Sequence, residues 1–242
     1  MKVLVIIPAY NEEKSIRAVV EKLTAECPEY DYLIVNDCSR DRTEQICWEE
    51  GYNYLSLPIN LGIGGGIQAG YRYAEYYGYD IAVQHDGDGQ HDATYIKTVI
   101  DPIVEGKCDI VIGSRFIEEK GFQSSAIRRL GIRWLSGMIK VCSGVRVKDV
   151  TSGFRAVNKQ YIKFYADEYP QDYPEPEAII MAKLAGAKIG EVPVIMHERL
   201  AGESSIRAWK SVYYMIKVSI AILIRRLTTP LICIGGKNDS NA

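Results

Sequence analysis

The sequence alternates short apolar runs with longer amphipathic segments through its first half, and this pattern restricts the fold more than any other feature. The apolar runs typical of strands lie at 3–7, 32–35, 54–57, 81–83 and 109–112. Segments with helical periodicity lie between them at 16–23, 43–50, 67–77 and 95–104. The first run is apolar at every position, as in an interior strand of a parallel sheet. The alternation predicts an α/β, doubly wound layer sandwich with a mostly parallel central sheet.

Composition limits the number of domains and the partners. The chain has 242 residues and is 47% hydrophobic, which is enough for one sizeable core, so we expect one main domain. Its 29 basic and 31 acidic side chains leave a net charge of −2, and we expect no nucleic-acid partner. Six cysteines lack paired spacing and no signal peptide precedes the first strand, which favours a reducing, cytoplasmic location.

Polar residues follow the first two strands, where the ligands of open α/β sheets bind. The segment 9–12 reads AYNE, and Asp37 follows the second strand. The ring of Tyr10 can stack on a base, while Glu12 and Asp37 can accept hydrogen bonds from a ribose or a base. These residues outline a nucleotide pocket. The alternative is that Asn11 and Asp37 only cap helices.

Two carboxylates follow the strand at 81–83, within the sequence QHDGDGQHD at 84–92. Side chains two positions apart on an extended segment point the same way, so Asp86 and Asp88 can converge on one cation that prefers oxygen ligands. Mg²⁺ or Mn²⁺ fits best, with phosphate oxygens and water completing the shell. A polar, glycine-rich turn is the alternative. His85 and His91 match no zinc spacing, and we expect them to be solvated or to support the pair.

A glycine-rich stretch at 62–66 offers a competing interpretation. Gly64, Gly66 and Ala69 fit G-x-G-x-x-A, and Asp86 follows about twenty residues later, as in dinucleotide-binding dehydrogenases. That fingerprint normally opens the first βαβ unit, whereas here it follows two complete units, so we do not favour it.

Seven sequence blocks together resemble a known family. They read IIPAYNEE, VNDCSRD, NLGIGGGIQAG, QHDGDGQHD, IGSRF, DVTSGFRA and ER..G.SS, and they stand in the family's order over roughly residues 1 to 206. The chain thus resembles the family 2 inverting glycosyltransferases of GT-A fold. It is most similar to the polyprenyl-phosphate glycosyltransferases, which include the dolichyl-phosphate mannose synthases. Those enzymes move a sugar from a nucleotide donor to a lipid phosphate.

The resemblance implies roles for individual residues. It implies nucleotide-sugar contacts at Pro8, Ala9, Tyr10, Glu12, Asp37, Gly62, Asp86, Gly87 and Ser204. It implies metal ligands at Asp86, Asp88 and Gln90, and stabilisation of phosphate charge by Arg115, Arg155 and Arg199. Arg199 and Ser204 lie on a stretch that resembles the family's acceptor loop. Ser205 departs from the pattern, because a Lys often follows the Ser there.

The acceptor decides whether a general base is needed. A lipid monophosphate loses its second proton near pH 6, as phosphoserine does, and needs no strong base. A sugar hydroxyl would require a carboxylate, for which Asp149, Glu175 and Glu177 are candidates. Each could instead be a helix cap or dipole partner, and the sequence leaves the choice open. His197, just before the acceptor loop, is a candidate diphosphate contact.

The C-terminal segment 206–227 is rich in apolar and aromatic residues and is bracketed by arginines and a lysine. Its longest uncharged run, 218–224, is far shorter than the roughly 20 residues of a membrane-spanning helix. We expect a catalytic domain at 1–205 and, at 206–242, an amphipathic helix at the membrane interface followed by a polar tail. A core-packed helix is the alternative. A second basic cluster, at Arg128, Arg129, Arg133 and Lys140, is also consistent with a membrane interface. The alternative is an ordinary solvated helix face.

These observations predict an inverting, metal-dependent transferase on the cytoplasmic face of a membrane. It would move a hexose from a nucleotide-sugar to polyprenyl phosphate, with Mg²⁺ or Mn²⁺ as cofactor. A small membrane partner protein is a further hypothesis. One alternative is transfer to a growing cell-surface glycan. Another is a scaffold that binds nucleotide-sugar without turnover, which the presence of Asp86, Asp88, Arg115 and Arg155 disfavours.

Overall fold

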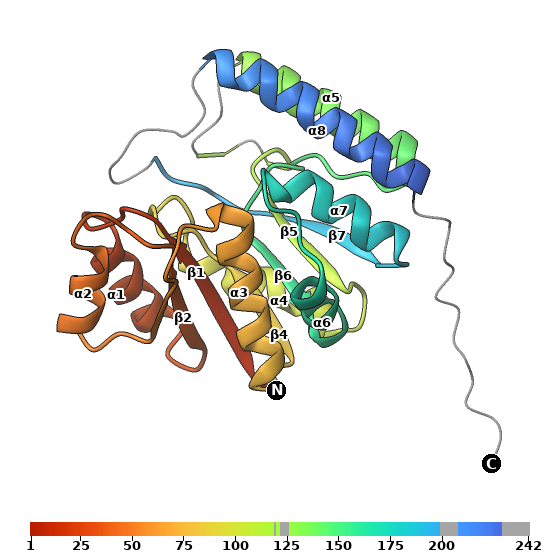
Figure 1. The fold of residues 1–242 in the computed structure, drawn as a ribbon. Coiled ribbons are helices and arrows are strands. Elements are labelled where there is room, and N and C mark those ends of the chain that lie inside the picture. Colours follow the sequence, from red (N-terminus) through yellow and green to blue (C-terminus); the bar gives the residue numbers. More distant parts are fainter. Residues whose placement is uncertain (119, 122–125, 199–207, 229–242) are drawn as a thin grey trace.

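The computed structural model describes residues 1–118, 120–121, 126–198 and 208–228, and these form a seven-stranded sheet with helices on both faces (Figure 1). The strand order is β3-β2-β1-β4-β6-β5-β7. The strands are β1 (Val3–Ala9), β2 (Asp31–Asn36), β3 (Tyr54–Ser56), β4 (Ile81–Gln84), β5 (Ile110–Ser114), β6 (Arg155–Asn158) and β7 (Ile189–Pro193). Strand β6 runs antiparallel to β4 and β5, and the other pairs are parallel. The predicted α/β fold with a mostly parallel sheet is confirmed.

Helices connect the strands in the predicted alternation. They are α1 (Ile16–Glu26), α2 (Thr43–Glu49), α3 (Gly62–Tyr76), the 3-10 helix η1 (Ala93–Tyr95), α4 (Ile96–Val104), α5 (Ala126–Ser143), α6 (Lys159–Asp167), α7 (Pro174–Leu184) and α8 (Ala208–Thr228). Helix α3 begins five residues before the predicted segment, because the glycine stretch is part of its first turns. The sequence did not reveal β6, β7, α6 or α7.

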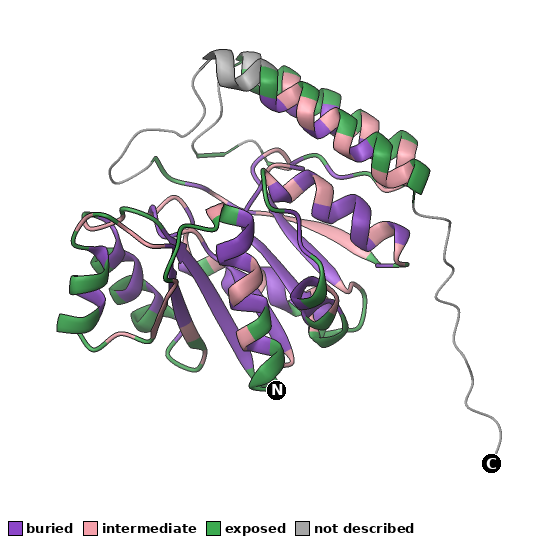
Figure 2. Ribbon diagram, viewed as in Figure 1, coloured by how far each residue is buried: buried purple, intermediate pink, exposed green. Residues whose placement is uncertain are grey.

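Two cores cover the two faces of the sheet, and β1 contributes to both. All seven residues of β1 are buried, as expected for a central strand. Val3, Val5 and Ile7 pack with α1 and α4, while Leu4 and Ile6 pack with α3 and α6 on the opposite face. Figure 2 shows this central sheet as the most continuously buried part of the molecule. Every connection between strands therefore has an apolar surface to cover.

The glycine stretch allows α3 to approach its neighbours closely. A Cβ at Gly64 would overlap the carbonyl oxygen of Pro170, and one at Gly70 would overlap Ile6. The Gly64 N–H donates to the Gln171 carbonyl at 3.1 Å. The glycines thus serve the contact between α3, the sheet and the α6–α7 connection, and do not form a dinucleotide fingerprint.

Helices α5, α7 and α8 form a third packed group at one end of the molecule. Helix α8 lies alongside α5 and also contacts α7 (Figure 1). Its residues Tyr214, Val218 and Ile222 are buried at a spacing of four, so they form one inward stripe. The core-packed alternative thus describes one face of α8. The opposite face carries exposed apolar side chains.

Candidate active site

A cleft of about 800 Å³ lies beyond the carboxyl ends of β1, β2, β4 and β5, where the sequence placed the functional residues. One part is lined by residues that follow β1 and β2 and by the start of α3. Another part is lined by residues that follow β4 and β5. The remaining wall comes from 151–153 and from α5, α7 and α8. The predicted nucleotide-sugar residues within the described chain all line it: Pro8, Ala9, Tyr10, Glu12, Asp37, Gly62, Asp86 and Gly87.

The loops after β1 and β2 are tied together. Asn11 has a left-handed backbone (φ 59°), its N–H donates to Ser39 Oγ at 3.0 Å, and its Oδ1 accepts from the Arg40 N–H at 2.8 Å. The Glu12 N–H donates to Thr43 Oγ1 at 2.8 Å. These bonds hold Tyr10 and Glu12 at the cleft. Asn11 thus joins two loops, and the N-cap residue of α1 is Ser15.

Asp37 connects β2 to the start of α3. Its side chain is buried, and Oδ1 accepts from the Leu61 N–H at 2.6 Å. Its carbonyl accepts from Asn60 Nδ2 at 2.9 Å. The N-cap residue of the following helix, α2, is Arg42. Asp37 is therefore not the N-cap residue of α2. It instead fixes the segment 60–62, which forms part of the cleft wall.

Asp86, Asp88 and Gln90 all line the cleft, although the backbone that carries them is not extended as predicted. The chain turns at 87–88, with Gly89 at φ 77°. The Gln90 N–H donates to Asp88 Oδ1 at 2.9 Å. A Cβ at Gly153 would lie 3.0 Å from both carboxylate oxygens of Asp86, so this glycine leaves room for that carboxylate. The turn, and not strand alternation, brings the two acids to one cleft.

His85 and His91 are buried beneath this turn, so of the two predicted roles the solvated one is wrong and the one of supporting the carboxylate pair fits. They are 2% and 5% exposed and pack edge-on against each other, with Phe154 beside both. The Asp86 N–H donates to His91 Nδ1 at 3.0 Å, and His91 Nε2 lies 3.5 Å from Asp86 Oδ2. Desolvation lowers the pKa of His85 to about 3 and that of His91 to about 4. Both rings are therefore neutral near pH 7.

The residues of the turn fit a hard divalent cation that is shared with a ligand. Two carboxylates and one amide line the cleft, and all three can coordinate a metal ion through oxygen. Within the described part of the chain, no three His, Cys, Asp or Glu side chains gather as a metal site. Mg²⁺ and Mn²⁺ commonly bind through one or two carboxylates, with phosphates and water completing the shell. These three side chains suit an ion that also binds phosphate and water, and not an ion coordinated by protein ligands alone.

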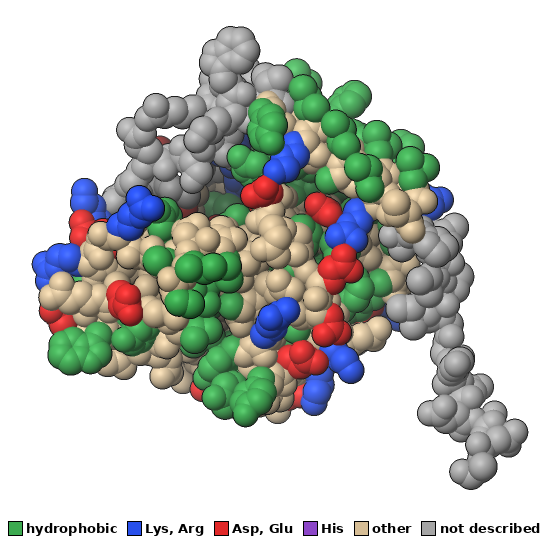
Figure 3. Space-filling model, in the orientation of Figure 1, with side chains coloured by type: hydrophobic (Ala, Val, Ile, Leu, Met, Phe, Trp, Pro, Cys, Tyr) green, Lys and Arg blue, Asp and Glu red, His purple; other side chains and the backbone are tan. Residues whose placement is uncertain are grey.

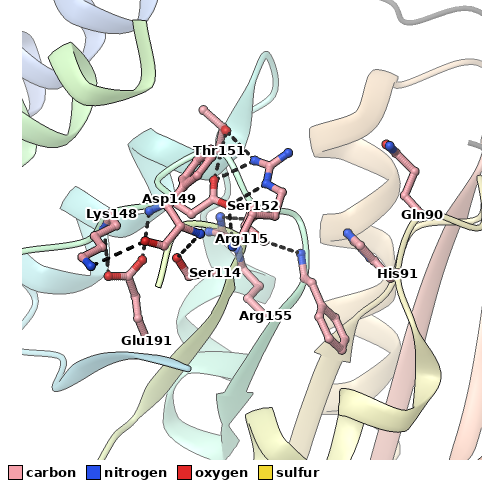
Figure 4. Close-up of polar contacts among 12 residues, drawn as sticks. Gln90, His91, Ser114, Arg115, Lys148, Asp149, Thr151, Ser152, Arg155 and Glu191 are labelled. Atoms are coloured by element: carbon pink, nitrogen blue, oxygen red, sulfur yellow. Dashed lines mark hydrogen bonds and ion pairs between the residues drawn. The ribbon is translucent and has the colours of Figure 1, made fainter. Parts of the chain in front are cut away.

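Arg115 lines the cleft after β5 and is held by Asp149 (Figure 4). Its Nε lies 2.7 Å from Asp149 Oδ2, and its Nη2 lies 2.7 Å from Oδ1. Nη2 also donates to Thr151 Oγ1 at 3.1 Å. Asp149 is fully buried and does not line the cleft. The structure thus contradicts its candidacy as an acceptor-side base, because its carboxylate clamps a guanidinium.

Arg155 does not contact the cleft, contrary to the expectation that it stabilises phosphate charge. It is fully buried, and Nη2 donates to the Ser152 carbonyl at 2.6 Å while Nη1 donates to the Glu175 carbonyl at 3.2 Å. Both acceptors belong to residues that line the cleft. Arg155 therefore supports the cleft wall from behind.

The other two candidate acids have different positions. Glu175 lines the cleft, and burial raises the pKa of its carboxyl while the nearby Arg155 acts in the opposite direction. Glu177 does not line the cleft and pairs with Arg225 of α8, with Oε1 2.9 Å from Nε. Of the three candidates, Glu175 alone can meet a ligand in the cleft.

Sequence reasoning missed several cleft residues at the end near α8. Tyr173 has a left-handed backbone (φ 52°), and its ring lies 4.6 Å from that of Tyr214. Both line the cleft, as do Arg128 of α5 and Met196. Arg128 stood out in the sequence only as one member of a basic cluster. Nothing in the local pattern separates Tyr173 or Tyr214 from the other tyrosines, since long-range packing brings them here.

His197 does not line the cleft, so the predicted diphosphate contact is not formed. Its Nε2 lies 2.9 Å from Asp92 Oδ2, and its N–H donates to the Gln90 carbonyl at 2.9 Å. It thus joins the segment at 194–197 to the end of the turn that carries Asp86 and Asp88. The predicted sites Arg199 and Ser204, and the departure at Ser205, lie outside the described residues.

The fold and the cleft define a nucleotide-diphospho-sugar transferase of GT-A-like architecture. Glucosyl-3-phosphoglycerate synthase from Mycobacterium tuberculosis, solved with Mn²⁺, UDP-glucose and phosphoglyceric acid, superposes with a TM-score of 0.70 at 19% identity, covering 95% of this chain and 80% of that one. Residues 4–165 match the family model described as glycosyl transferase family 2. This chain belongs to glycosyl transferase family 2.

Two relatives are similar over most of their length. The UDP-N-acetylglucosamine–dolichyl-phosphate N-acetylglucosaminyltransferase of Methanococcus voltae is 35% identical over 213 residues, which cover 79% of this chain and 84% of the relative. The undecaprenyl-phosphate mannosyltransferase of Micrococcus luteus is 29% identical over 215 residues, covering 85% and 88%. The resemblance to polyprenyl-phosphate glycosyltransferases is thus confirmed.

Proposed function

We propose that this protein is an inverting, metal-dependent glycosyltransferase that moves a hexose from a nucleotide-sugar to polyprenyl phosphate. The observation that carries the proposal is the composition of the cleft. The residues expected to bind the nucleotide and the paired carboxylates line one part of the cleft, and α5, α7 and α8 line an adjoining part. The outer faces of α5 and α8 are apolar. The relatives that act on dolichyl and undecaprenyl phosphate support this acceptor class.

The described cleft residues have separate proposed roles in the reaction. Tyr10, Glu12 and Asp37 would bind the nucleoside, and Asp86, Asp88 and Gln90, which all line the cleft, would hold Mg²⁺ or Mn²⁺. When bound, that ion neutralises the charge of the departing diphosphate. Mn²⁺ accompanies UDP-glucose in the solved synthase, which supports this assignment.

Arg115 adds a fixed positive charge beside the diphosphate, because Asp149 sets its direction. The acceptor phosphate attacks the anomeric carbon from the face opposite the leaving diphosphate, which inverts the configuration. A phosphate dianion needs no general base. Arg199 and Ser204 remain proposed contributors from outside the described residues.

Helices α5 and α8 would place the cleft at a membrane surface. Their exposed apolar side chains are Leu130, Trp134 and Val141 on α5 and Tyr213, Ile216, Ile220, Leu223, Ile224 and Leu227 on α8. Figure 3 shows apolar side chains gathered along this pair. Arg129, Arg133 and Lys140 of α5 are exposed and suit anionic lipid headgroups. No helix in the described ranges is long and apolar enough to cross a bilayer.

We propose that the protein binds peripherally to the cytoplasmic face through the outer faces of α5 and α8. The predicted boundary at 205/206 and the predicted polar tail lie outside the described residues. A small membrane partner protein would complete the assembly. Recovery of the protein only in the soluble fraction of its own cells would contradict this placement.

The test incubates the purified protein with Mn²⁺ or Mg²⁺, polyprenyl phosphate and labelled UDP-, GDP- and dTDP-sugars in turn. Metal-dependent label in the organic phase from one donor would support the lipid acceptor and identify the sugar. Donor binding without lipid label would favour a glycan acceptor or a missing membrane partner protein. For a glycan acceptor, Glu175 is the one of the three candidate bases that lines the cleft. Donor binding without transfer to any acceptor would favour the scaffold alternative.

A further inference from the structure

The direction of Arg115 depends on a segment that has no regular structure. Asp149, which clamps Arg115, lies between α5 and β6 in a stretch without helix or strand. Asp149 Oδ2 also accepts from the Arg115 N–H at 3.2 Å. A bidentate pair requires both partners to hold their positions closely. Within this stretch the Asp149 carbonyl accepts from the Ser152 N–H at 3.3 Å, and the Thr151 hydroxyl donates to Asp149 Oδ1 at 3.3 Å. Neither bond involves the Asp149 N–H, whose partner lies outside the stretch.

Glu191 of β7 is that partner (Figure 4). Its Oε2 accepts from the Lys148 N–H at 2.8 Å, and its Oε1 accepts from the Asp149 N–H at 2.9 Å. One half-buried carboxylate thus holds two consecutive backbone N–H groups, the second of which belongs to the residue that clamps Arg115.

The position of Glu191 in the sheet makes this support rigid. Strand β7 pairs in parallel with β5, with Glu191 opposite Ile112, and Arg115 follows the end of β5 directly. The carboxylate is therefore fixed relative to the strand that carries Arg115. Glu191 does not line the cleft, so any effect on a ligand must pass through Asp149 and Arg115.

We propose that Glu191 is a positioning residue, which holds Asp149 and through it aims the Arg115 guanidinium into the cleft. The kinetic part of this inference rests on the proposed function, in which Arg115 meets phosphate charge. Loss of the Glu191 carboxylate releases two consecutive backbone N–H groups and lets the clamp shift. The consequence is a mispositioned cation, not an absent one.

The test compares Glu191→Gln with Asp109→Asn. Gln is isosteric, but its amide nitrogen cannot accept, so one of the two backbone N–H groups loses its partner. Asp109 is a matched control, because it also accepts two hydrogen bonds, from the Lys188 N–H at 2.8 Å and from Asn158 Nδ2 at 2.9 Å. It lies just before β5, at the opposite end of the strand from Arg115.

The first readout is the ¹⁵N–¹H signal of Arg115 Nε in the substrate-free protein, assigned by its loss in Arg115→Lys. We expect Glu191→Gln to shift or broaden this signal and Asp109→Asn to leave it unchanged. The second readout is turnover with polyprenyl phosphate. We expect Glu191→Gln to lower kcat by about ten-fold with little change in donor KM, the size typical when a residue that orients a site residue is lost.

An unchanged Arg115 signal and kcat in folded Glu191→Gln would overturn the inference, as would an equal effect of Asp109→Asn. If Glu191→Gln does not fold, Glu191→Asp, whose shorter side chain reaches fewer partners, must alter the same signal for the inference to hold. Absence of lipid transfer by the wild-type protein would contradict the proposed function instead. The substrate-free signal would still decide the role of Glu191.

Discussion

Two arginines near the cleft show how burial separates residues that look alike in the sequence. Arg115 faces the cleft and is clamped by a carboxylate, whereas Arg155 lies behind the wall and donates to carbonyls. A guanidinium prefers carboxylate or phosphate oxygens, so from the sequence alone both arginines were candidate phosphate ligands. At the scale of single residues, contact with the cleft determines function, and residue type alone does not.

Asp88 gives the sharpest test of the metal assignment. Asp88→Ala is expected to lower metal-dependent transfer by roughly 100-fold or more, because the ion loses a ligand that places it against the diphosphate. The fold should persist, since the Asp88 side chain lines the cleft and accepts from the Gln90 N–H within its own turn. Initial rates at several Mn²⁺ concentrations measure the effect, and circular dichroism checks the fold.

Asp92→Ala is the matched control for this change. Asp92 lies four residues further on but outside the cleft, where it pairs with Lys22 and His197. This variant should keep most of its transfer activity and its metal dependence. Near-normal turnover by a folded Asp88→Ala protein would refute the metal role of Asp88.

The Arg115 and Asp149 pair should behave as a buried ion pair in stability measurements. Arg115→Met is expected to lower the free energy of unfolding by about 3 kcal/mol, because it leaves the Asp149 carboxylate buried without its cation. The double variant Arg115→Met/Asp149→Asn should be more stable than the single one, since it removes the stranded charge. Urea unfolding measures both, and a double variant no more stable than Arg115→Met would contradict this account.

At the scale of elements, α8 has two different faces. Tyr214, Val218 and Ile222 pack inward, while the opposite side exposes apolar residues beside those of α5. An exposed apolar stripe of this size on two adjacent helices is uncommon on a monomer that contacts only water. The same helix also supplies Tyr214 to the cleft, so the element proposed to face the membrane is part of the site wall.

Charged substitutions on the outer face of α8 should weaken membrane binding. Ile220→Asp/Leu223→Asp is expected to reduce binding to vesicles that contain anionic lipid by about ten-fold or more, because both side chains would lose apolar burial in the interface. Cosedimentation measures the bound fraction. The control is Tyr76→Asp, a highly exposed aromatic at the far end of α3. Equal loss in both variants, or in neither, would contradict the proposed membrane face.

At the scale of the whole molecule, the buried histidines make stability depend on pH. The folded pKa of His85 is about 3 and that of His91 about 4, both below the unfolded value of about 6.5. The unfolded chain binds more protons between these values, so stability rises with pH in that window and is lost as pH falls from about 6.5 towards 4. Each unit of difference corresponds to about 1.4 kcal/mol.

Metal-free protein unfolded in urea at a series of pH values tests this expectation. The free energy of unfolding should fall on acidification through the window from pH 6.5 to 4. His85→Phe removes one of the two groups and can pack beside Phe154, so its profile should be flatter. Identical slopes for the variant and the wild-type protein would show that His85 does not cause the acid sensitivity.

The sequence by itself determined the elements and the residues that follow the first strands. Apolar periodicity is local, so it located β1, β2 and β4 and their helices, and the carboxyl-end rule put Tyr10, Asp37, Asp86 and Asp88 at one cleft. It could not reveal β6 (RAVN) and β7 (IGEVP), because charged and polar residues interrupt the apolar run in both.

Only the tertiary structure decided which polar residues face the cleft and which lie behind it. Three predicted site residues lie outside the cleft: Arg155 donates to carbonyls, Asp149 pairs with a guanidinium, and Glu177 pairs with α8. Conversely, packing brings Tyr173 and Tyr214, which are 41 positions apart in the sequence, together at the cleft. Such contacts join segments distant in the chain. Their physical basis is burial and hydrogen-bond satisfaction in three dimensions, which no local pattern encodes.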